Sequence, residues 1–184
     1  GDLVMISKNG AKPGDEVALT DPKLHTWVYT CMKDGRILVN HTDPVEGRGY
    51  YLMKPKPNAR PVYERIRCEL AEKGYLDRLS LSVDEKKICF EFQKGFKRKV
   101  AGRVLYLADF DQERRLISNF KTIANKDEKP AWFAYPRWTR DQSGIVYHAA
   151  KSLYLYDLKS EETKMVSMDP EGDYRYPHGE GTPK

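Results

Sequence analysis

The chain has 184 residues, of which 40% are hydrophobic and 32% are charged, and its formal net charge at pH 7 is +5. No apolar run approaches the roughly 20 residues that a membrane-spanning helix needs, so we expect no insertion into a membrane. The charge is only mildly basic, and no long basic stripe carries stacking aromatic residues, so the sequence does not favour a nucleic-acid partner. The three cysteines are odd in number and lack metal-ligand spacing, which argues against a disulfide framework.

The first third of the chain predicts short strands joined by polar turns. Residues 1–22 contain two apolar segments around a turn with Asn-Gly and Pro-Gly, and we interpret them as the outer half of an incomplete unit. Residues 23–65 predict a complete unit with an Asp-Gly hairpin turn at Asp34 and a loop over 41–49. Its four strands are expected at residues 26–31, 36–40, 50–54 and 61–64.

The same pattern returns twice along the chain. Residues 77–118 and 135–168 each predict four strands, of which the first leads into a turn opened by Asp84 or Asp141. The strands are expected at 79–83, 87–92, 104–109 and 114–118, and then at 135–139, 145–148, 152–157 and 163–167. Residues 169–184 are interpreted as the start of a further unit or as a tail.

A repeat of roughly 50 residues built from four short strands is typical of the blades of a β-propeller. The predicted fold is therefore all-β, in one propeller-like domain whose blades have four antiparallel strands. The chain supplies about three and a half such units, whereas closed propellers have about 4–8 blades, so we expect an incomplete or fragmentary propeller. An open arc exposes unpaired strand edges, and we expect these edges to favour self-association.

Two connections are longer than plain turns. Residues 65–77 place apolar residues among charged ones and predict a short amphipathic helix that Gly74 ends. Residues 119–134, which include Trp132, predict a structured insertion. Both connect the last strand of one unit to the first strand of the next, so we expect them around the central mouth of the propeller.

The third unit carries a motif that resembles a known family. It reads PRWTRDQSGIVY over residues 136–147 and LYLYDL over 153–158. This resembles the repeat of TolB-like β-propellers, which reads Pro-x-Trp-Ser-Pro-Asp-Gly-x-x-Ile-x-Phe, although Thr139 and Arg140 replace Ser-Pro and a residue is inserted before Gly144. The resemblance implies a periplasmic or secreted protein. It also implies a role as a protein-binding module, as a gating domain of a peptidase or, in a related lyase group, as an enzyme.

A candidate ligand site lies around the expected mouth. It combines aromatic rings with arginine, the composition that is enriched in recognition hot spots and suits stacking on a sugar ring. Its residues are His25, Asp77, Arg78, Trp132, Tyr135 and Arg137. The alternative interpretation is an insertion over 119–134 that its own aromatic residues pack onto the blade.

A candidate metal site comes from polar residues that recur at one position of the repeat. Asn40, Glu91 and His148 each stand three residues after the isoleucine of the second strand, and histidine and carboxylate are ordinary metal ligands. The candidate ligands of a divalent ion such as Mn or Ca are His25, His41, Glu91 and His148. We favour the alternative that these are solvated strand ends and that the protein has no cofactor.

Other recurring residues are assigned structural roles. We expect the turn aspartates to accept backbone N–H groups and fix the hairpins. Trp27 and Trp138 are interpreted as equivalent packing anchors in the first strands of their units. The basic run over 93–103 is either a solvated hairpin loop or a contact for acidic groups.

The predicted function is a non-catalytic TolB-like propeller module that presents a loop-lined mouth to a protein or an acidic saccharide. The sequence contains no GxSxG elbow, HExxH motif, phosphate-binding glycine loop or dinucleotide fingerprint. Propeller enzymes assemble their sites from distant loops, so this leaves catalysis open. The alternative function is a metal-assisted lyase on uronic-acid oligosaccharides, in which Arg78 or Arg137 binds a carboxylate and His25 or His148 holds the metal or abstracts a proton.

Overall fold

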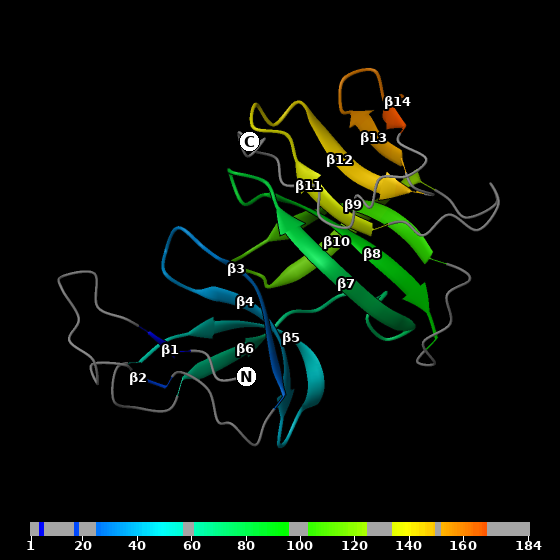
Figure 1. Ribbon diagram of the computed structural model, residues 1–184. Helices are drawn as coiled ribbons and strands as arrows, with labels where there is room; N and C mark the ends of the chain where they lie inside the picture. Colours follow the sequence, from blue (N-terminus) through cyan, green and yellow to red (C-terminus); the bar gives the residue numbers. More distant parts are fainter. Residues whose placement is uncertain are drawn as a thin grey trace. The chain divides into compact units, whose positions relative to one another are not determined.

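The computed structural model describes residues 4–5, 17–18, 25–56, 61–95, 103–124, 134–149 and 152–168. These residues form three four-stranded antiparallel sheets and one two-stranded sheet (Figure 1). The described part of the chain contains no helix, and so none with the length and hydrophobicity to cross a membrane. The all-β prediction is confirmed.

Each four-stranded sheet is built from four strands that follow one another in the chain. The first sheet contains β3 (Thr26–Cys31), β4 (Ile37–Asp43), β5 (Gly47–Lys54) and β6 (Val62–Arg65). The second contains β7 (Gly74–Leu81), β8 (Lys87–Lys94), β9 (Arg103–Asp111) and β10 (Leu116–Ala124). The third contains β11 (Ala134–Trp138), β12 (Gly144–Ala149), β13 (Ser152–Asp157) and β14 (Thr163–Met168). This meander is the arrangement expected of propeller blades.

The chain divides into two compact units, Gly1–Arg67 and Cys68–Lys184. The first unit contains the first sheet and the pair β1 (Val4–Met5) and β2 (Val17–Ala18). The second unit contains the second and third sheets. The rest of residues 1–22 and all of 169–184, where the sequence predicted partial blades, lie outside the described residues.

The predicted role of the turn aspartates is confirmed. A carboxylate oxygen of Asp34, Asp84 and Asp141 accepts the backbone N–H two residues later, at 2.9, 3.1 and 3.1 Å. In the two longer turns the backbone also passes through a left-handed residue, Glu85 (φ 59°) or Gln142 (φ 61°). Because these bonds close each turn before the second strand begins, the aspartates fix the hairpin geometry from local sequence.

The Asp141 turn should make the third sheet sensitive to acid. Hydrogen bonds from the Thr139 hydroxyl and from the backbone and side chain of Ser143 lower the pKa of Asp141 from its usual 3.8 to about 2. Because the pKa of Asp141 is lower in the folded state than in the unfolded state, its ionised carboxylate stabilises the fold fully above pH 3.8. This stabilisation is lost as the pH falls through about 2. We therefore expect the thermal midpoint to fall between pH 4 and pH 2, and to fall less in Asp141→Asn. Thermal melts by circular dichroism test this; an equal fall in Asp141→Asn and wild type would contradict it, and Glu162→Gln is the control for an exposed carboxylate.

Two predictions about connections are wrong. The expected helix over 65–77 is absent, because Gly74 begins β7 instead of ending a helix. A Cβ at Gly74 would lie 2.1 Å from the Gln93 carbonyl oxygen, so glycine serves a close approach of two strands there. The expected loop over 41–49 is a tight hairpin of three turn residues, 44–46, in which the Asp43 carboxylate accepts the N–H groups of Val45 and Glu46.

The equivalence of the two tryptophans is also wrong. Trp138 pairs with Ile145 in the third sheet, and the residue that pairs in the same way with Ile37 in the first sheet is Cys31. Trp27 pairs with Asn40, closer to the start of its strand, and is 60% exposed. Trp138 does act as an anchor, because its Nε1–H donates to the carbonyl of Ser80 in the neighbouring sheet at 3.0 Å.

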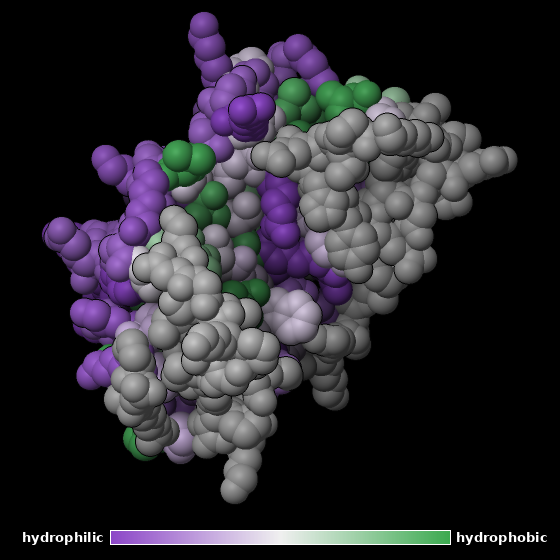
Figure 2. All heavy atoms as spheres, turned by 60° about the vertical axis from the view of Figure 1, so that its left-hand side comes forward, coloured by the Kyte–Doolittle hydropathy of each residue, from purple (hydrophilic) through white to green (hydrophobic). Residues whose placement is uncertain are grey.

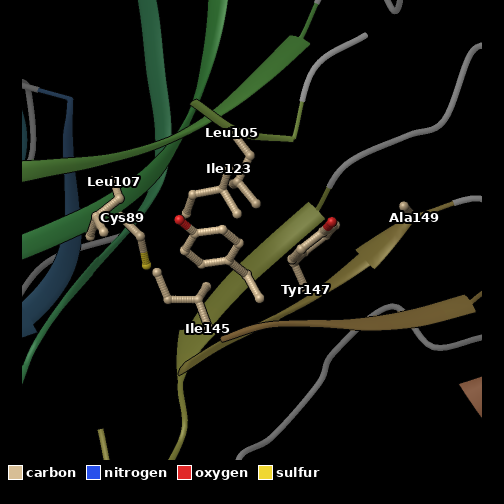
Figure 3. Close-up of a cluster of buried hydrophobic side chains, with 8 residues drawn as sticks. Cys89, Leu105, Leu107, Ile123, Ile145, Tyr147 and Ala149 are labelled. Atoms are coloured by element: carbon tan, nitrogen blue, oxygen red, sulfur yellow. The ribbon is translucent and has the colours of Figure 1, made fainter. Parts of the chain in front are cut away.

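The second and third sheets share one hydrophobic core (Figure 3). The second sheet contributes Cys89, Leu105, Leu107 and Ile123, and the third contributes Ile145, Tyr147, Ala149 and Tyr156. β11 packs against both β7 and β8. The two sheets are therefore joined as neighbouring blades are, by interdigitating apolar faces. Each large apolar side chain that is fully buried there stabilises the fold by about 1.5–3 kcal/mol.

The first sheet has a core of its own within the first unit. Ile37, Val39, Tyr51 and Met53 are buried there, and Val28 and Tyr63 pack against them.

On the face shown in Figure 2, hydrophilic side chains are the most widespread kind among the described residues, while hydrophobic side chains form small groups.

Candidate functional site

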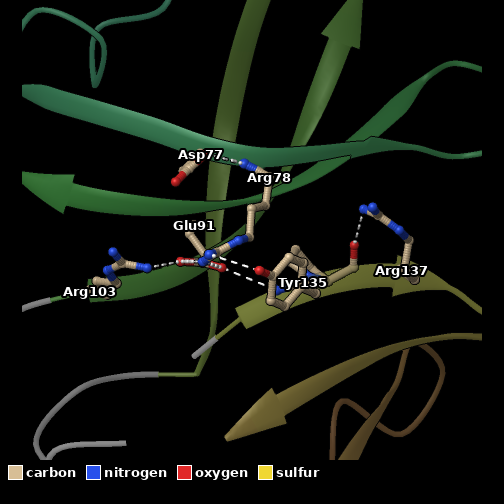
Figure 4. A network of polar contacts seen from close by, with 7 residues as sticks. Asp77, Arg78, Glu91, Arg103, Tyr135 and Arg137 are labelled. Atoms are coloured by element: carbon tan, nitrogen blue, oxygen red, sulfur yellow. Dashed lines mark hydrogen bonds and ion pairs between the residues drawn. The ribbon is translucent and has the colours of Figure 1, made fainter. Parts of the chain in front are cut away.

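A buried glutamate lies at the centre of the polar network that joins the second and third sheets (Figure 4). The Glu91 side chain, in the middle of β8, is only 1% exposed. Arg78 from β7 donates through Nη1 to both carboxylate oxygens, at 2.8 and 3.0 Å. Arg103 from β9 donates through Nη1 to Oε2 at 2.7 Å. Two guanidinium groups therefore compensate the one buried carboxylate.

Tyr135 connects this network to the third sheet. Its backbone N–H donates to Glu91 Oε1 at 3.1 Å, and its hydroxyl oxygen accepts a bond from Arg78 Nη2 at 3.3 Å. The Arg78 guanidinium also lies over the Tyr135 ring, with Cζ 4.0 Å from the ring centroid. One arginine thus contacts the carboxylate of its own sheet and the aromatic ring of the next, and such cation–π pairs contribute about 0.5–2 kcal/mol.

The local backbone explains how these side chains reach one another. Arg78 (φ 53°) and Tyr135 (φ 57°) adopt left-handed conformations, each at a β-bulge in the first strand of its sheet. The Asp77 carboxylate accepts the Arg78 N–H at 2.9 Å. A left-handed backbone conformation costs a non-glycine residue about 1–3 kcal/mol. It persists only where surrounding contacts hold the residue in place. The Glu91 contacts supply such surroundings for both residues.

The electrostatics of the network follow from burial and pairing. Burial raises the pKa of Glu91 above its ordinary value, and the two guanidinium groups oppose that rise. Partial burial acts to lower the pKa of Arg78, but the Glu91 carboxylate outweighs it and holds that pKa above its usual range. The arginine therefore remains a cation in the network.

The structure brings together three of the six predicted ligand residues: Asp77, Arg78 and Tyr135. Arg137, two residues further along β11, is exposed and donates to the carbonyl of Pro136 at 3.1 Å, away from Glu91 (Figure 4). His25 belongs to the first unit, where it directly precedes β3, and Trp132 lies outside the described residues.

Sequence reasoning missed the role of Arg103, which it counted within a basic run. A signal for the network was present, because a glutamate in the otherwise apolar strand segment ICFEF is a charge placed where burial is expected. Buried charges need partners, so Glu91 called for cations on the flanking strands. Arg78 and Arg103 fill that requirement.

The predicted metal ligands do not assemble into a recognisable metal site. Within the described ranges, no group of three or more His, Cys, Asp or Glu side chains is arranged to hold an ion. His25 and His41 belong to the first unit, and Glu91 and His148 to the second. His41 is buried, shares a hydrogen bond of 2.8 Å between Nδ1 and the Thr26 hydroxyl, and stacks on a tyrosine ring. Glu91 is engaged by the two arginines, so the divalent ion stays a prediction.

Comparison with known proteins supports the fold. No protein-family model and no curated protein sequence matches the chain. A solved structure of a luciferin-regenerating enzyme, a protein of β-propeller type, is similar to it with a TM-score of 0.52 and 13% sequence identity. The similarity covers 92% of this chain and 57% of the other, so this chain spans little more than half the length of that protein. The repeated four-stranded sheets together with this neighbour establish an all-β, propeller-like fold.

Proposed function

We propose that the chain is a non-catalytic, TolB-like binding module that takes an acidic group, from a protein or a saccharide, at the pair Arg78 and Tyr135, with Arg137 of the same strand as a further cation. The observation that carries this proposal is the buried Glu91 carboxylate, which holds Arg78 and Tyr135 in fixed, left-handed positions where two sheets meet. The TolB-like resemblance and a periplasmic or secreted placement belong to the same proposal and rest on the sequence motif.

Rigidity is the first argument for binding. The Arg78 side chain is 25% exposed, yet it is fixed by Glu91 on one side and by the Tyr135 ring on the other. Ordering a rotamer-rich side chain on binding costs about 0.5–1.5 kcal/mol. The fold already orders the Arg78 side chain, so ligand binding does not carry this cost. The partly exposed Arg78 guanidinium and Tyr135 ring therefore form a preorganised surface.

Chemistry is the second argument. An arginine beside a partly exposed aromatic ring suits a ligand that has both a carboxylate and a flat or apolar face, such as a uronic acid or an acidic peptide side chain. Arg137 adds a second, exposed cation on the same strand as Tyr135. Arg78 and Arg103 bring two positive charges to the single Glu91 carboxylate, which therefore offsets only one of them.

The same pairing favours binding over catalysis. A general base or metal ligand must present a lone pair to a proton or an ion, whereas both Glu91 oxygens accept bonds from guanidinium groups. The alternative function, a metal-assisted lyase on uronic-acid oligosaccharides, requires a metal at His25, His41, Glu91 or His148. We keep it as an outcome that the binding experiment must distinguish.

The test is calorimetric titration of the protein with uronic-acid oligosaccharides and with neutral oligosaccharides of equal length. We expect binding of the acidic series alone, weakened by salt because the contact is between exposed charges. Arg137→Ala should weaken binding about tenfold, as loss of one charge-assisted hydrogen bond does, while Lys159→Ala, in an exposed turn of the same sheet, should leave it unchanged.

Two results would overturn the proposal. One is equal binding of acidic and neutral oligosaccharides, or no binding of either together with none of acidic peptides. The other is cleavage of the uronide when Mn²⁺ or Ca²⁺ is added, which would establish the lyase instead. Sedimentation at rising protein concentration, run alongside, tests the expected self-association through open strand edges.

A further inference from the structure

The Trp27 ring is exposed on the first sheet. Trp27 is 60% exposed, although tryptophan is on average a highly buried residue. A single exposed apolar residue needs no explanation. What gives Trp27 meaning is the set of side chains that the strand register places beside it.

One row of side chains crosses the sheet from Trp27. Val28 and Val39, which pair across β3 and β4, belong to the core of the first sheet. Trp27 and Asn40 are the next pair along these strands, so their side chains point to the opposite face. Tyr50 of β5 pairs with Asn40. Trp27, Asn40 and Tyr50 therefore lie in one row on this face.

A second row lies beside the first, at the end of the sheet. Thr42 and Arg48 pair two residues further along β4 and β5. The carbonyl of His25 accepts the Thr42 N–H at 3.1 Å, which continues the ladder one step before β3. The two rows form a surface of about 10 Å by 7 Å, from two strand spacings and two residue steps. We call it the first-sheet platform; its residues are His25, Trp27, Asn40, Thr42, Arg48 and Tyr50.

Asn40 orients Arg48 on this platform. Asn40 is only 3% exposed, and its Oδ1 accepts a hydrogen bond from Arg48 Nε at 3.1 Å. A buried amide thus directs an exposed arginine across the same face as the Trp27 ring. A guanidinium has five N–H donors in a planar fork, so one arginine can bind Asn40 and a ligand carboxylate together.

The composition of the first-sheet platform indicates the class of ligand. It combines a flat apolar ring with a cation and with amide, hydroxyl and imidazole groups, and it contains no acidic residue. We propose that this platform binds the pyranose ring of an acidic saccharide. The apolar face of the sugar stacks on Trp27, its carboxylate binds Arg48, and its hydroxyl groups bond to Asn40 and Thr42.

The same composition favours a saccharide over other anionic ligands. An acidic peptide side chain has a carboxylate but no flat face that carries hydroxyl groups. A nucleotide has a flat face, but its phosphate carries up to about two charges, whereas the platform has one arginine. A uronic acid supplies one carboxylate for Arg48 and one ring for Trp27.

This site is separate from the one proposed at Arg78 and Tyr135. The whole first-sheet platform belongs to the first unit, and Arg78, Tyr135 and Arg137 belong to the second. The platform depends on the exposed Trp27 ring and on the bond between Asn40 and Arg48, and the Glu91 network takes no part in it. Either site can therefore fail in experiment while the other holds.

NMR signals of the tryptophan indole N–H groups test the proposal on the full chain. The sequence contains three tryptophans, and the signal that Trp27→Phe removes belongs to Trp27. A disaccharide with one uronic acid should shift this signal saturably. The neutral disaccharide of the same linkage should bind at least about tenfold more weakly, as loss of one charge-assisted hydrogen bond predicts.

Variants assign the two contacts. Arg48→Ala should weaken binding of the acidic disaccharide about tenfold and abolish the preference over the neutral one. Trp27→Ala, read from the backbone amide signal of Asn40, should weaken it at least about tenfold, as truncation of a hot-spot aromatic residue does. Val45→Ala, at a 92% exposed position of the hairpin between β4 and β5, is the matched control and should change nothing. Arg137→Ala should also leave the Trp27 shift unchanged.

Each contrary outcome overturns the proposal. An unshifted Trp27 signal in wild type would show that the platform binds no acidic sugar. Equal affinity for the neutral disaccharide would show that Arg48 does not select a carboxylate. An equal shift with an acidic peptide or with a nucleoside monophosphate would show that the ring is not selected as a sugar. Loss of the Trp27 shift in Arg137→Ala would show that there is no separate site in the first unit.

Discussion

Replacing Glu91 by alanine should lower the free energy of unfolding of the second unit by about 3–5 kcal/mol, the usual cost of removing one partner from a buried ion pair. The variant leaves Arg78 and Arg103 without the carboxylate that both contact, and it removes the acceptor of the Tyr135 N–H. Urea denaturation followed by circular dichroism measures the change.

Two controls identify the cause of that loss. Glu91→Gln retains the shape and one acceptor but not the charge, so its loss should be smaller than that of Glu91→Ala. Glu46→Ala removes an exposed partner that lies 3.9 Å from Arg65, and exposed pairs contribute about 0–1 kcal/mol. A loss below about 1 kcal/mol in Glu91→Ala, equal to that of the exposed pair, would show that the network does not hold the sheets together.

Trp138→Ala should cost about 3 kcal/mol, the lower end of the range for truncation of a large core aromatic residue, because Trp138 is partly buried. The indole packs against the core shared by the second and third sheets and bonds to the Ser80 carbonyl. Trp138→Phe, which keeps most of the packing and loses the bond, should cost less, and the hydrogen bond itself is worth about 0.5–1.5 kcal/mol.

The matched control is Trp27→Ala, because the sequence treated the two tryptophans as equivalent. Trp27 is 60% exposed, and exposed substitutions usually change stability by less than about 0.5 kcal/mol. Denaturation by circular dichroism compares the two. Equal losses in Trp27→Ala and Trp138→Ala would support the equivalence and contradict the strand register described above.

The strands and turns were predictable because their signals are local. Alternating apolar residues and an aspartate at the start of each turn depend on neighbours within about ten residues. The structure confirms the three turns at Asp34, Asp84 and Asp141 in the form the sequence indicates. The same local logic failed at Gly74, where the glycine is required by the carbonyl of Gln93 on the neighbouring strand, a contact that no nearby residue reveals.

The candidate site was only half predictable for a related reason. Asp77, Arg78 and Tyr135 were selected as residues at a mouth, but their organising partner, Glu91, was assigned to a metal site and Arg103 to a basic loop. Their convergence depends on two β-bulges that turn Arg78 and Tyr135 toward Glu91. A bulge adds one residue to one strand, and nothing in the repeat pattern indicates where that residue is placed.

The most direct test of this account is the exchange rate of the Tyr135 backbone amide, measured by NMR in wild type and in Glu91→Ala. If Glu91 joins the second sheet to the third, this amide should exchange slowly in wild type and at least about tenfold faster in the variant, relative to core amides such as that of Phe90. The same fast rate in both proteins would contradict the account, because the carboxylate would then hold neither the bulge nor the surface proposed to bind ligand.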